Sequence, residues 1–480
     1  MRMIYQVEDK PQLGQILVFA LQQILSVVTA TIAVPLIVGN GLSPAAALFG
    51  AGAGTLIYIL FTKHKSPVFL GSNFSFVKPM VVAFAGATSM ALGYLGLIIG
   101  SVLGGLVYVI LSLLVKIFGT GWIDRFIPET VIGPTVALIG LTLAPEAVNN
   151  LVQGGVKESV TQYSVSFIDG IPTIVEEVIQ ESAASVWIAL VCGLTAFFVS
   201  MITSVFGKKK IKLLPFLIGI VLGYLVASIF TVIGNVTGIR ELKIIDFDIY
   251  ADVLFADGIS VSTFVKIPDF VFLKAWGGFG ELNLSYIVTL LVAFVPVAFV
   301  GFAEHIADHK NLSGIIERDL FKDPGLTRTL LGDGVGSMVG AFFGGASNTT
   351  YGESIGCVAL SRNASVVTTV ATALGCMILS CLSPVVAFME TIPPCVMGGI
   401  CIGLYGFICV SGFVMIQGLD FNLDKNVYIV SSVLVLGVGG LGLTIGEVTI
   451  TEIAVALIIG IICNLIVGRA KNYSGKDTEE

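Results

Sequence analysis

Glu304 and Glu353 are the residues best suited to chemistry, because each is a carboxylate in a stretch that otherwise has membrane-spanning character. Glu304 lies in the run 303–309 (AEHIADH) and Glu353 in the run 347–354 (SNTTYGES). A charge at bilayer depth costs at least ~2.5–3.5 kcal/mol on insertion scales, so such a residue is a functional candidate by default. Two of them predict that a polar solute binds within the membrane, which favours a transporter.

The composition agrees with a membrane protein. The chain has 480 residues, of which 55% are hydrophobic and only 12% are charged. A soluble protein carries about 25% charged residues, so the composition excludes that class. The net charge of −7 does not indicate a nucleic-acid partner, and the 8 cysteines have no spacing typical of a metal site or a disulfide framework.

Apolar runs of about 20 residues predict an all-α polytopic protein with about 14 spans in the lipid bilayer. Lys and Arg fall after every even-numbered span, and the short loops after odd spans nearly lack them. By the positive-inside rule, the even loops and both termini are cytoplasmic. Two longer odd loops, 146–183 and 238–284, also hold Lys, but long loops are weak signals of topology. The spans are expected to start near Gln15, Pro44, Val68, Leu92, Ile127, Ala184, Leu213, Ser285, Leu326, Asn348, Val366, Pro393, Asn426 and Glu447.

Two pairs of similar segments indicate an internal repeat. Residues 127–133 (IPETVIG) resemble 392–398 (IPPCVMG), and 72–78 (SNFSFVK) resemble 347–353 (SNTTYGE). These pairs match span 5 with span 12 and span 3 with span 10, so each repeat holds seven spans. Because seven is odd, the second copy lies upside down, which is the 7+7 inverted repeat of secondary transporters.

The segments 69–76 and 344–351 differ from ordinary spanning helices. They are rich in Gly, Ser, Asn, Thr and aromatic residues, which favour turns and extended backbone. Broken spans at matching positions of two repeats mark a transporter's binding site. We therefore expect two short antiparallel strands in spans 3 and 10, each followed by a half-helix whose N-terminal amides point at the site. The alternative is that these small residues only allow close helix packing, which leaves the Asn and Glu side chains unexplained.

The runs 71–74 (GSNF), 303–305 (AEH), 318–326 (RDLFKDPGL) and 348–353 (NTTYGE) resemble the bacterial uracil permeases of the nucleobase–ascorbate transporter family. The resemblance covers nearly the whole chain. It implies a symporter in the cell membrane that imports uracil by alternating access, with a proton as the coupling ion and no cofactor. It also implies a homodimer joined through its gate domains. The implied core domain comprises residues 1–125 and 285–391, and the gate domain comprises 126–284 and 392–480, including a cytoplasmic tail.

By the same resemblance, Glu304 and Glu353 hold the base and Phe74 stacks on it. A carboxylate accepts from the ring N–H groups of uracil, and helix-start amides donate to its carbonyls. Stacking of a base on an aromatic ring is worth ~1–3 kcal/mol. Phe74 and Tyr405 also have a plain alternative as packing residues. The remaining pocket residues are Ala30, Tyr351, Gly352 and Tyr405, and supporting roles are expected for Asn73, Lys78, His305, Asn348 and Thr349.

The coupling proton is assigned to Glu304, assisted by Asp308. Asp308 follows one helical turn later on the same side, whereas His305 and His309 point about a quarter-turn away. The two histidines have a metal-ligand spacing, but the Glu that zinc proteases place after the first His is absent. Neither a metal site nor an enzyme is expected.

Two positions leave the substrate open. Glu353 favours uracil, because purine transporters of the family carry Gln there, but Asp308 replaces the His of uracil permeases with the acid of purine carriers. A purine (xanthine or uric acid) permease is therefore one alternative, and an anion carrier with the same architecture is another. Lys78 stands where uracil permeases have a small residue and is the repeat counterpart of Glu353. We hypothesise that Lys78 and Asp308 form an ion pair, directly or through water; otherwise Lys78 extends to the cytoplasmic interface.

Overall fold

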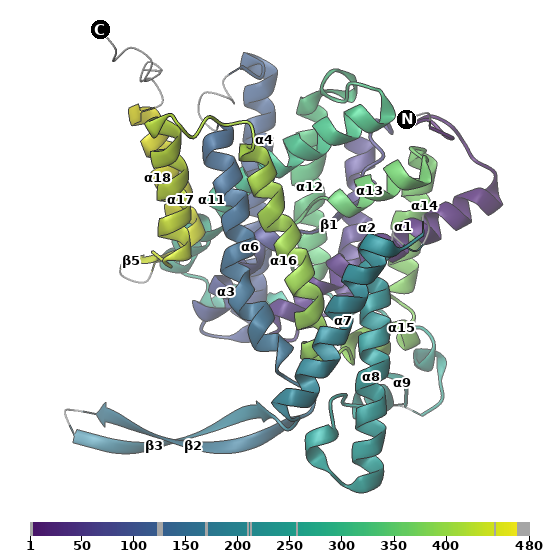
Figure 1. Ribbon diagram of the computed structural model, residues 1–480, viewed down its shortest axis with the longest axis vertical. Coiled ribbons are helices and arrows are strands. Elements are labelled where there is room, and N and C mark those ends of the chain that lie inside the picture. Colours follow the sequence, from purple (N-terminus) through teal and green to yellow (C-terminus); the bar gives the residue numbers. More distant parts are fainter. Residues whose placement is uncertain are drawn as a thin grey trace. The chain divides into compact units, whose positions relative to one another are not determined.

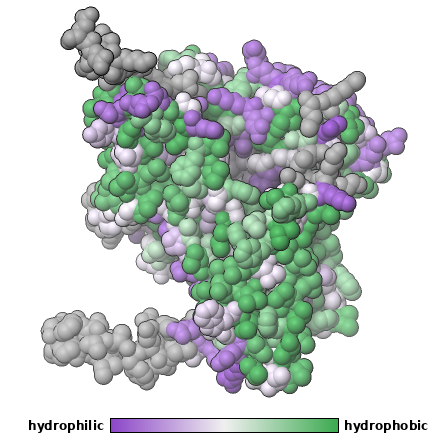
Figure 2. Space-filling model, in the orientation of Figure 1, coloured by the Kyte–Doolittle hydropathy of each residue, from purple (hydrophilic) through white to green (hydrophobic). Residues whose placement is uncertain are grey.

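The computed structural model describes residues 3–121, 128–168, 171–208, 211, 214–255, 258–445 and 448–467. The chain is predominantly helical (Figure 1). Within these residues, eight helices are long and apolar enough to cross a membrane, and Figure 2 shows hydrophobic side chains over much of the helical surface. They are α1 (Leu13–Val38), α2 (Pro44–Phe61), α4 (Met90–Phe118), α6 (Glu129–Leu151), α7 (Val186–Phe206), α8 (Pro215–Thr237), α11 (Leu284–Ile316) and α16 (Pro394–Ile416).

The remaining helices include those that follow the broken segments. α3 (Val77–Ala85) follows the 3₁₀ turn η1 (Phe74–Phe76), and α13 (Gly352–Ser361) follows the segment 344–351. The others are α9 (Asp248–Phe255), α10 (Val271–Ala275), α12 (Leu326–Gly344), α14 (Val366–Leu379), α15 (Ser383–Glu390), α17 (Asp424–Val438) and α18 (Glu452–Val467).

Side-chain caps explain where several helices begin. The Ser43 side chain accepts from the amide of Ala46 at the start of α2, where Pro44 occupies the first helical position. Ser89 and Asn283 cap α4 and α11 in the same way. Such caps satisfy amides that have no partner inside the helix, so the starts of these helices are encoded locally.

By internal contacts the chain forms two compact units. One comprises residues 1–144, 264–386 and 404–480, and the other comprises 145–263 and 387–403. The predicted core and gate domains are defined by relative movement and stay a prediction. The predicted cytoplasmic tail after residue 467 lies outside the described residues.

The smaller unit contains a packed helix pair and a β-hairpin. α7 and α8 approach closely at Gly219, where a Cβ would lie 2.0 Å from Ser200 Oγ. The strands β2 (Lys157–Ile168) and β3 (Ile171–Ser182) pair antiparallel (Figure 1). We expected only two short strands in the whole chain, so this hairpin corrects the expected fold. Its Val, Ile, Thr and aromatic residues favour extended backbone. The hairpin lies in a loop between two predicted spans, which a search for apolar runs does not describe.

In the larger unit, two three-residue strands pair antiparallel. β1 (Leu70–Ser72) pairs with β4 (Asn348–Thr350), with Gly71 opposite Thr349. All six strand residues are buried. The Leu70 amide of β1 donates to Thr55 Oγ1 on α2 at 2.9 Å. Irregular backbone among apolar helices is tolerated where protein groups satisfy it, and Thr55 does this for β1. A third small hairpin joins β5 (Leu443–Ile445) to β6 (Val448–Ile450).

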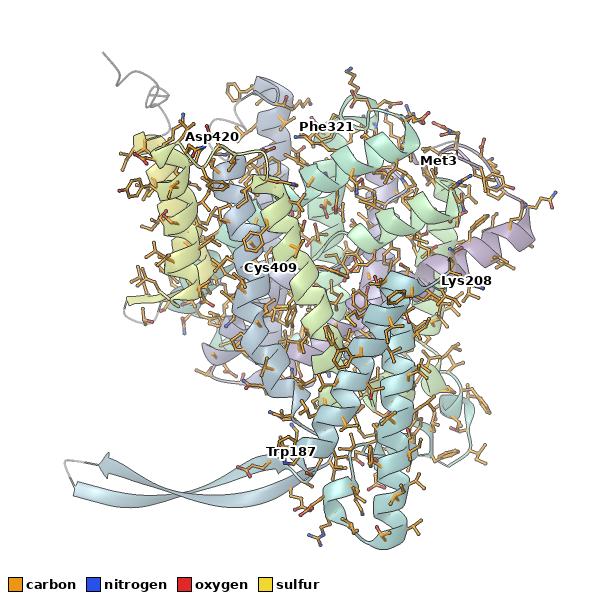
Figure 3. The ribbon with its side chains drawn as sticks, viewed as in Figure 1. Met3, Trp187, Lys208, Phe321, Cys409 and Asp420 are labelled. Atoms are coloured by element: carbon orange, nitrogen blue, oxygen red, sulfur yellow. The ribbon has the colours of Figure 1, made fainter. Side chains whose placement is uncertain are left out.

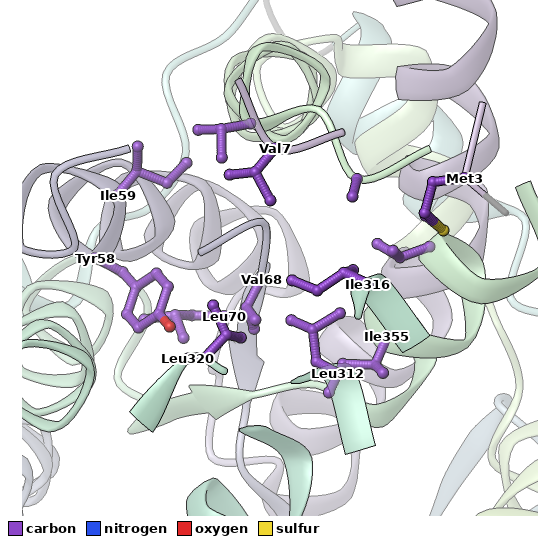
Figure 4. Packing of buried hydrophobic residues seen from close by; sticks show 13 residues of the cluster. Met3, Val7, Tyr58, Ile59, Val68, Leu70, Leu312, Ile316, Leu320 and Ile355 are labelled. Carbon is purple, nitrogen blue, oxygen red and sulfur yellow. The ribbon is translucent and has the colours of Figure 1, made fainter. Parts of the chain in front are cut away.

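An apolar cluster packs against the side of β1 and α13 shown in Figure 4. It joins Leu70 of β1 to Leu312 of α11 and Ile355 of α13, and it includes Met3 and Val7 of the N-terminal segment. That segment is held by the residue that ends α13, because the amide of Ile4 donates to the Arg362 carbonyl at 2.8 Å. The N-terminal segment thereby fixes the far end of the half-helix that begins at Gly352.

Charged loop residues form a network of ion pairs in the larger unit. Lys65 and Arg318 both donate to the Asp323 carboxylate, at 2.7 and 2.6 Å. Lys65 first, and then Arg318, lower the pKa of Asp323 from its usual value. Arg318 also pairs with Glu8, so the N-terminal segment belongs to this network too.

Candidate substrate-binding site

Glu304 faces the turn that follows β1. Its Oε1 accepts from Ser75 Oγ at 3.2 Å. Ser75 is itself positioned by Asn73, whose Oδ1 accepts from the Ser75 amide at 2.8 Å and caps the turn. Although α11 is surrounded by other helices, Glu304 and Asp308 are only half-buried, so these carboxylates border an accessible space.

Asp308 lies one turn further along α11 and contacts the second strand. Thr350 Oγ1 donates to Asp308 Oδ2 at 2.7 Å. Glu304 and Asp308 therefore lie on the strand-facing side of α11, one reaching η1 and the other reaching β4. The helical spacing predicted this shared side.

The hypothesised direct pair between Lys78 and Asp308 is wrong. Lys78 Nζ instead lies 3.5 Å from Glu452 Oε1, in the first turn of α18. The physical reason is the direction of α3, which carries Lys78 to an acidic side chain on α18. The lysine is thus paired, but with a residue that the sequence did not single out.

Phe74 and Tyr405 lie together. Phe74 is 8% exposed and Tyr405 is 2% exposed. Their rings meet edge to face with centroids 6.0 Å apart. Ala30 of α1 is also buried, and α1 packs against β1 and α13. Phe74 is therefore oriented by packing on Tyr405, and both readings of these aromatics, as packing and as binding residues, are compatible with this contact.

The start of α13 supplies backbone amides and Glu353. Gly352 is exposed and Glu353 is half-buried, although both neighbours, Tyr351 and Ser354, are buried. Ser354 anchors the turn, because its Oγ accepts from Gln23 Nε2 at 3.0 Å and from the Phe69 amide at 3.1 Å. A side chain at Gly352 would meet nothing within 4 Å, so the helix start opens onto free space.

Tyr351 and Asn348 hold the strands in place. Tyr351 Oη donates to the Ser72 carbonyl at 2.7 Å, and Asn348 Nδ2 donates to the Gly50 carbonyl at 3.2 Å. At Gly71 a Cβ would lie 2.3 Å from the Tyr351 ring. Gly71 is therefore required by the close approach of this ring.

His305 and Asp333 form a buried pair on another side of α11. Asp333 Oδ2 lies 2.7 Å from His305 Nδ1 and accepts from Thr349 Oγ1 at 3.3 Å. His305 Nε2 lies 3.0 Å from Thr329 Oγ1. The side chains of Asp333 and His305 are fully buried. Since a carboxylate accepts, His305 Nδ1 is the donor in this pair.

His309 has a separate and structural set of partners. Its Nδ1 donates to the His305 carbonyl at 2.8 Å, which leaves Nε2 as an acceptor for Tyr58 Oη, also at 2.8 Å. Tyr58 Oη lies 2.7 Å from Ser66 Oγ. These bonds satisfy both ring nitrogens of His309, and none of them involves the Glu304 carboxylate.

Asp333 is the residue that sequence reasoning missed. It stands in the apolar run 331–336 (LGDGVG), so the argument used for Glu304, an acid within a span, applies to it equally. In α12 it is flanked by Gly332 and Gly334, which let that helix approach α2 and α4. Its second oxygen, Oδ1, has no hydrogen-bond partner among the described residues.

These residues supply the kinds of groups that could hold a planar polar solute. Three half-buried carboxylates supply acceptors, the start of α13 supplies donors, and Phe74 supplies a ring face. No cluster of three His, Cys, Asp or Glu able to hold a metal occurs in the described part of the chain. Long apolar helices around paired strands, each strand followed by a half-helix, define a membrane transport protein.

The comparisons with known proteins agree with this class. The sequence model of the Permease family matches residues 14–446. The uracil permeases of Bacillus caldolyticus and Bacillus subtilis are each 33% identical to the chain, covering 96% and 99% of it and 94% and 97% of their own lengths. The uracil permease of Escherichia coli is 29% identical over 96% of the chain and 93% of its own length. The chain therefore belongs to this permease family, and it is a multi-pass membrane transporter and not an enzyme.

Solved structures share the fold at low identity. The transmembrane domain of a cyanobacterial bicarbonate transporter, BicA, matches with a TM-score of 0.60 and 14% identity, covering 96% of this chain and all of that domain. The murine Slc26a9 anion transporter in its inward-facing state also matches with a TM-score of 0.60, at 13% identity, over 96% of this chain and 69% of its own. At these identities the likeness concerns the fold alone.

Proposed function

We propose that the protein imports uracil across the cell membrane together with a proton, by alternating access. The observation that carries the proposal is the near full-length similarity, at 33% identity, to proteins named uracil permease. The site chemistry supports it, because carboxylates, helix-start amides and an aromatic ring are what a flat ring with alternating C=O and N–H groups requires.

In the proposed complex, Glu353 and Glu304 accept from the ring N–H groups and the amides at the start of α13 donate to a carbonyl. Phe74 stacks on the base, while Tyr405 supports the Phe74 ring. Ala30 and Gly352 present little side chain and leave room for the base. Asn73, Asn348, Thr349 and Tyr351 support the site through η1 and the two strands.

The coupling proton is assigned to Glu304, with Asp308 beside it. Both are half-buried and both accept from a hydroxyl, of Ser75 and Thr350 respectively. Among the described residues, neither carboxylate has a Lys or Arg partner within ion-pair distance. A carboxylate in such surroundings favours binding a proton. His305 and His309 are committed to buried partners, which argues against their carrying the proton.

The proposed architecture is a 7+7 inverted repeat of 14 spans with both termini in the cytoplasm. The core domain uses spans 1–4 and 8–11 and the gate domain spans 5–7 and 12–14, and the protein forms a homodimer through the gates. The antiparallel pairing of β1 with β4 supports the repeat, since inversion brings the two strands together in opposite directions. The spans are assigned to α1, α2, β1 with α3, α4, α6, α7 and α8 in the first repeat, and to α11, α12, β4 with α13, α14, α16, α17 and α18 in the second.

The experiment is uptake of labelled uracil into vesicles that contain the purified protein, with an imposed pH gradient. We expect uracil to accumulate, and unlabelled xanthine and uric acid to compete weakly. Xanthine uptake as strong as uracil uptake in the same vesicles would assign the purine alternative, which Asp308 keeps open. Uracil uptake that ignores the pH gradient would refute proton coupling.

A further inference from the structure

Lys78 and Glu452 form an ion pair between two elements far apart in the sequence. Lys78 Nζ lies 3.5 Å from Glu452 Oε1, and their side chains are 38% and 20% exposed. The pair is therefore neither sealed in the interior nor freely solvated. Both residues lie in the larger unit.

Lys78 is linked directly to the site. It lies three residues after Ser75, the donor to Glu304, at the start of α3. Ser75 belongs to η1, and Lys78 is the second residue of α3, which follows η1 directly. A change in the position of Lys78 therefore affects η1, the turn that carries Phe74 and Ser75.

Glu452 lies in the first turn of α18. Thr451 caps this helix, because its Oγ1 accepts from the Ala454 amide at 3.4 Å. Negative charge in the first turn is favoured by the helix dipole, so Glu452 suits this position. The strand before α18, β6, and α18 itself pack against α11. Glu452 therefore lies at the start of a helix that packs against α11, the helix that carries Glu304.

We propose that Lys78 and Glu452 act as a latch that holds the outer path to the site closed and opens in each transport cycle. The inference rests on the proposed function, in which α3 belongs to the core domain, α18 to the gate domain, and the junction of β6 with α18 faces outward. Alternating access moves core against gate, so a pair that joins them exists in only one of the two conformations. Such a contact biases the equilibrium between them.

The size of the bias follows from the exposure of the pair. A partly exposed ion pair changes an equilibrium by about two- to five-fold, and salt screens it. The apparent affinity for a ligand scales with the populated fraction of the competent conformation. Removing the latch should therefore lower KM for uracil at the outer face, and raise it at the cytoplasmic face, by about two- to five-fold.

The test uses Lys78→Gln/Glu452→Gln, in which both charges are removed, and the charge swap Lys78→Glu/Glu452→Lys. Uracil KM is measured in right-side-out and inside-out vesicles. The double neutral variant should shift the two KM values in opposite directions, and the swap should return them toward wild type. Raising the salt concentration should reduce the difference between the wild type and the neutral variant. The matched control is Lys322→Gln/Asp319→Asn, which removes a pair 3.2 Å apart within one loop and should change neither KM.

A second measurement does not depend on the substrate. Amide hydrogen exchange of the purified protein should be faster in α3 and at the start of α18 in the neutral variant, and restored in the swap. KM shifts in the same direction at both faces would overturn the latch. So would a charge swap whose KM values are no closer to wild type than those of the neutral variant. If the wild type takes up no uracil while exchange responds as expected, the proposed substrate fails and the latch stands.

Discussion

Asp333 gives the sharpest test of the buried network behind the site. In Asp333→Ala, His305 Nδ1 and Thr349 Oγ1 both lose their acceptor at 2.7 and 3.3 Å. A buried donor left without a partner costs about 1–3 kcal/mol, so the two together predict a loss of about 2–6 kcal/mol. Asp333→Asn can keep an oxygen at the Oδ2 position, which accepts from both His305 and Thr349. It places an amide NH2 at the Oδ1 position, which has no partner among the described residues, so we expect a loss smaller than that of Asp333→Ala.

The assay is thermal unfolding of the purified protein, with and without uracil. The order of midpoints should be wild type, Asp333→Asn, then Asp333→Ala. Because Asp333 and His305 share one hydrogen bond, their changes should not add: Asp333→Ala/His305→Ala should be less destabilised than the sum of the two single variants. Full additivity, or a wild-type midpoint for Asp333→Ala, would refute the structural role assigned to this carboxylate.

Three further predictions concern the site. Glu304→Gln should abolish uracil accumulation driven by a pH gradient and leave uracil exchange between the two faces, whereas His309→Ala should keep accumulation; the reverse result would move the proton to the histidine. Phe74→Ala should weaken uracil affinity by about 5- to 150-fold, which corresponds to ~1–3 kcal/mol of stacking, and an unchanged affinity in binding calorimetry would make Phe74 a packing residue. Gly71→Ala should destabilise the protein by about 1–3 kcal/mol, because its Cβ would lie 2.3 Å from the Tyr351 ring; an unchanged midpoint in thermal unfolding would show that the ring moves aside freely.

The part of the site that the sequence predicted rests on local physics. Helical spacing alone separates Glu304 and Asp308 from His305 and His309, and the structure has these pairs on different sides of α11. The Gly- and Ser-rich runs likewise predicted extended backbone, which appears as β1 and β4. These inferences needed only the geometry of one helix or one short segment.

What the sequence did not predict depends on which distant elements meet. Nothing local says that α3 brings Lys78 to Glu452 or that α12 brings Asp333 to His305. The Lys78–Asp308 hypothesis paired two residues that depart from the family's pattern in spans 3 and 8. The direct pair is wrong because Lys78 lies beside Glu452 at the start of α18. The β2–β3 hairpin was missed because a count of apolar spans gives no information on the loops between them.

Many polar residues surround β1 and β4, because such residues are needed both to satisfy the strand backbone and to bind a solute. A strand among apolar helices must have its backbone groups satisfied by protein, and here Thr55, Ser354 and Tyr351 do so. In the proposed complex, the carboxylates of Glu304 and Glu353 and the amides at the start of α13 are instead the polar groups that contact the base. Changing Thr55 or Ser354 should therefore disturb binding through the shape of the strands, even though neither residue is expected to touch the base.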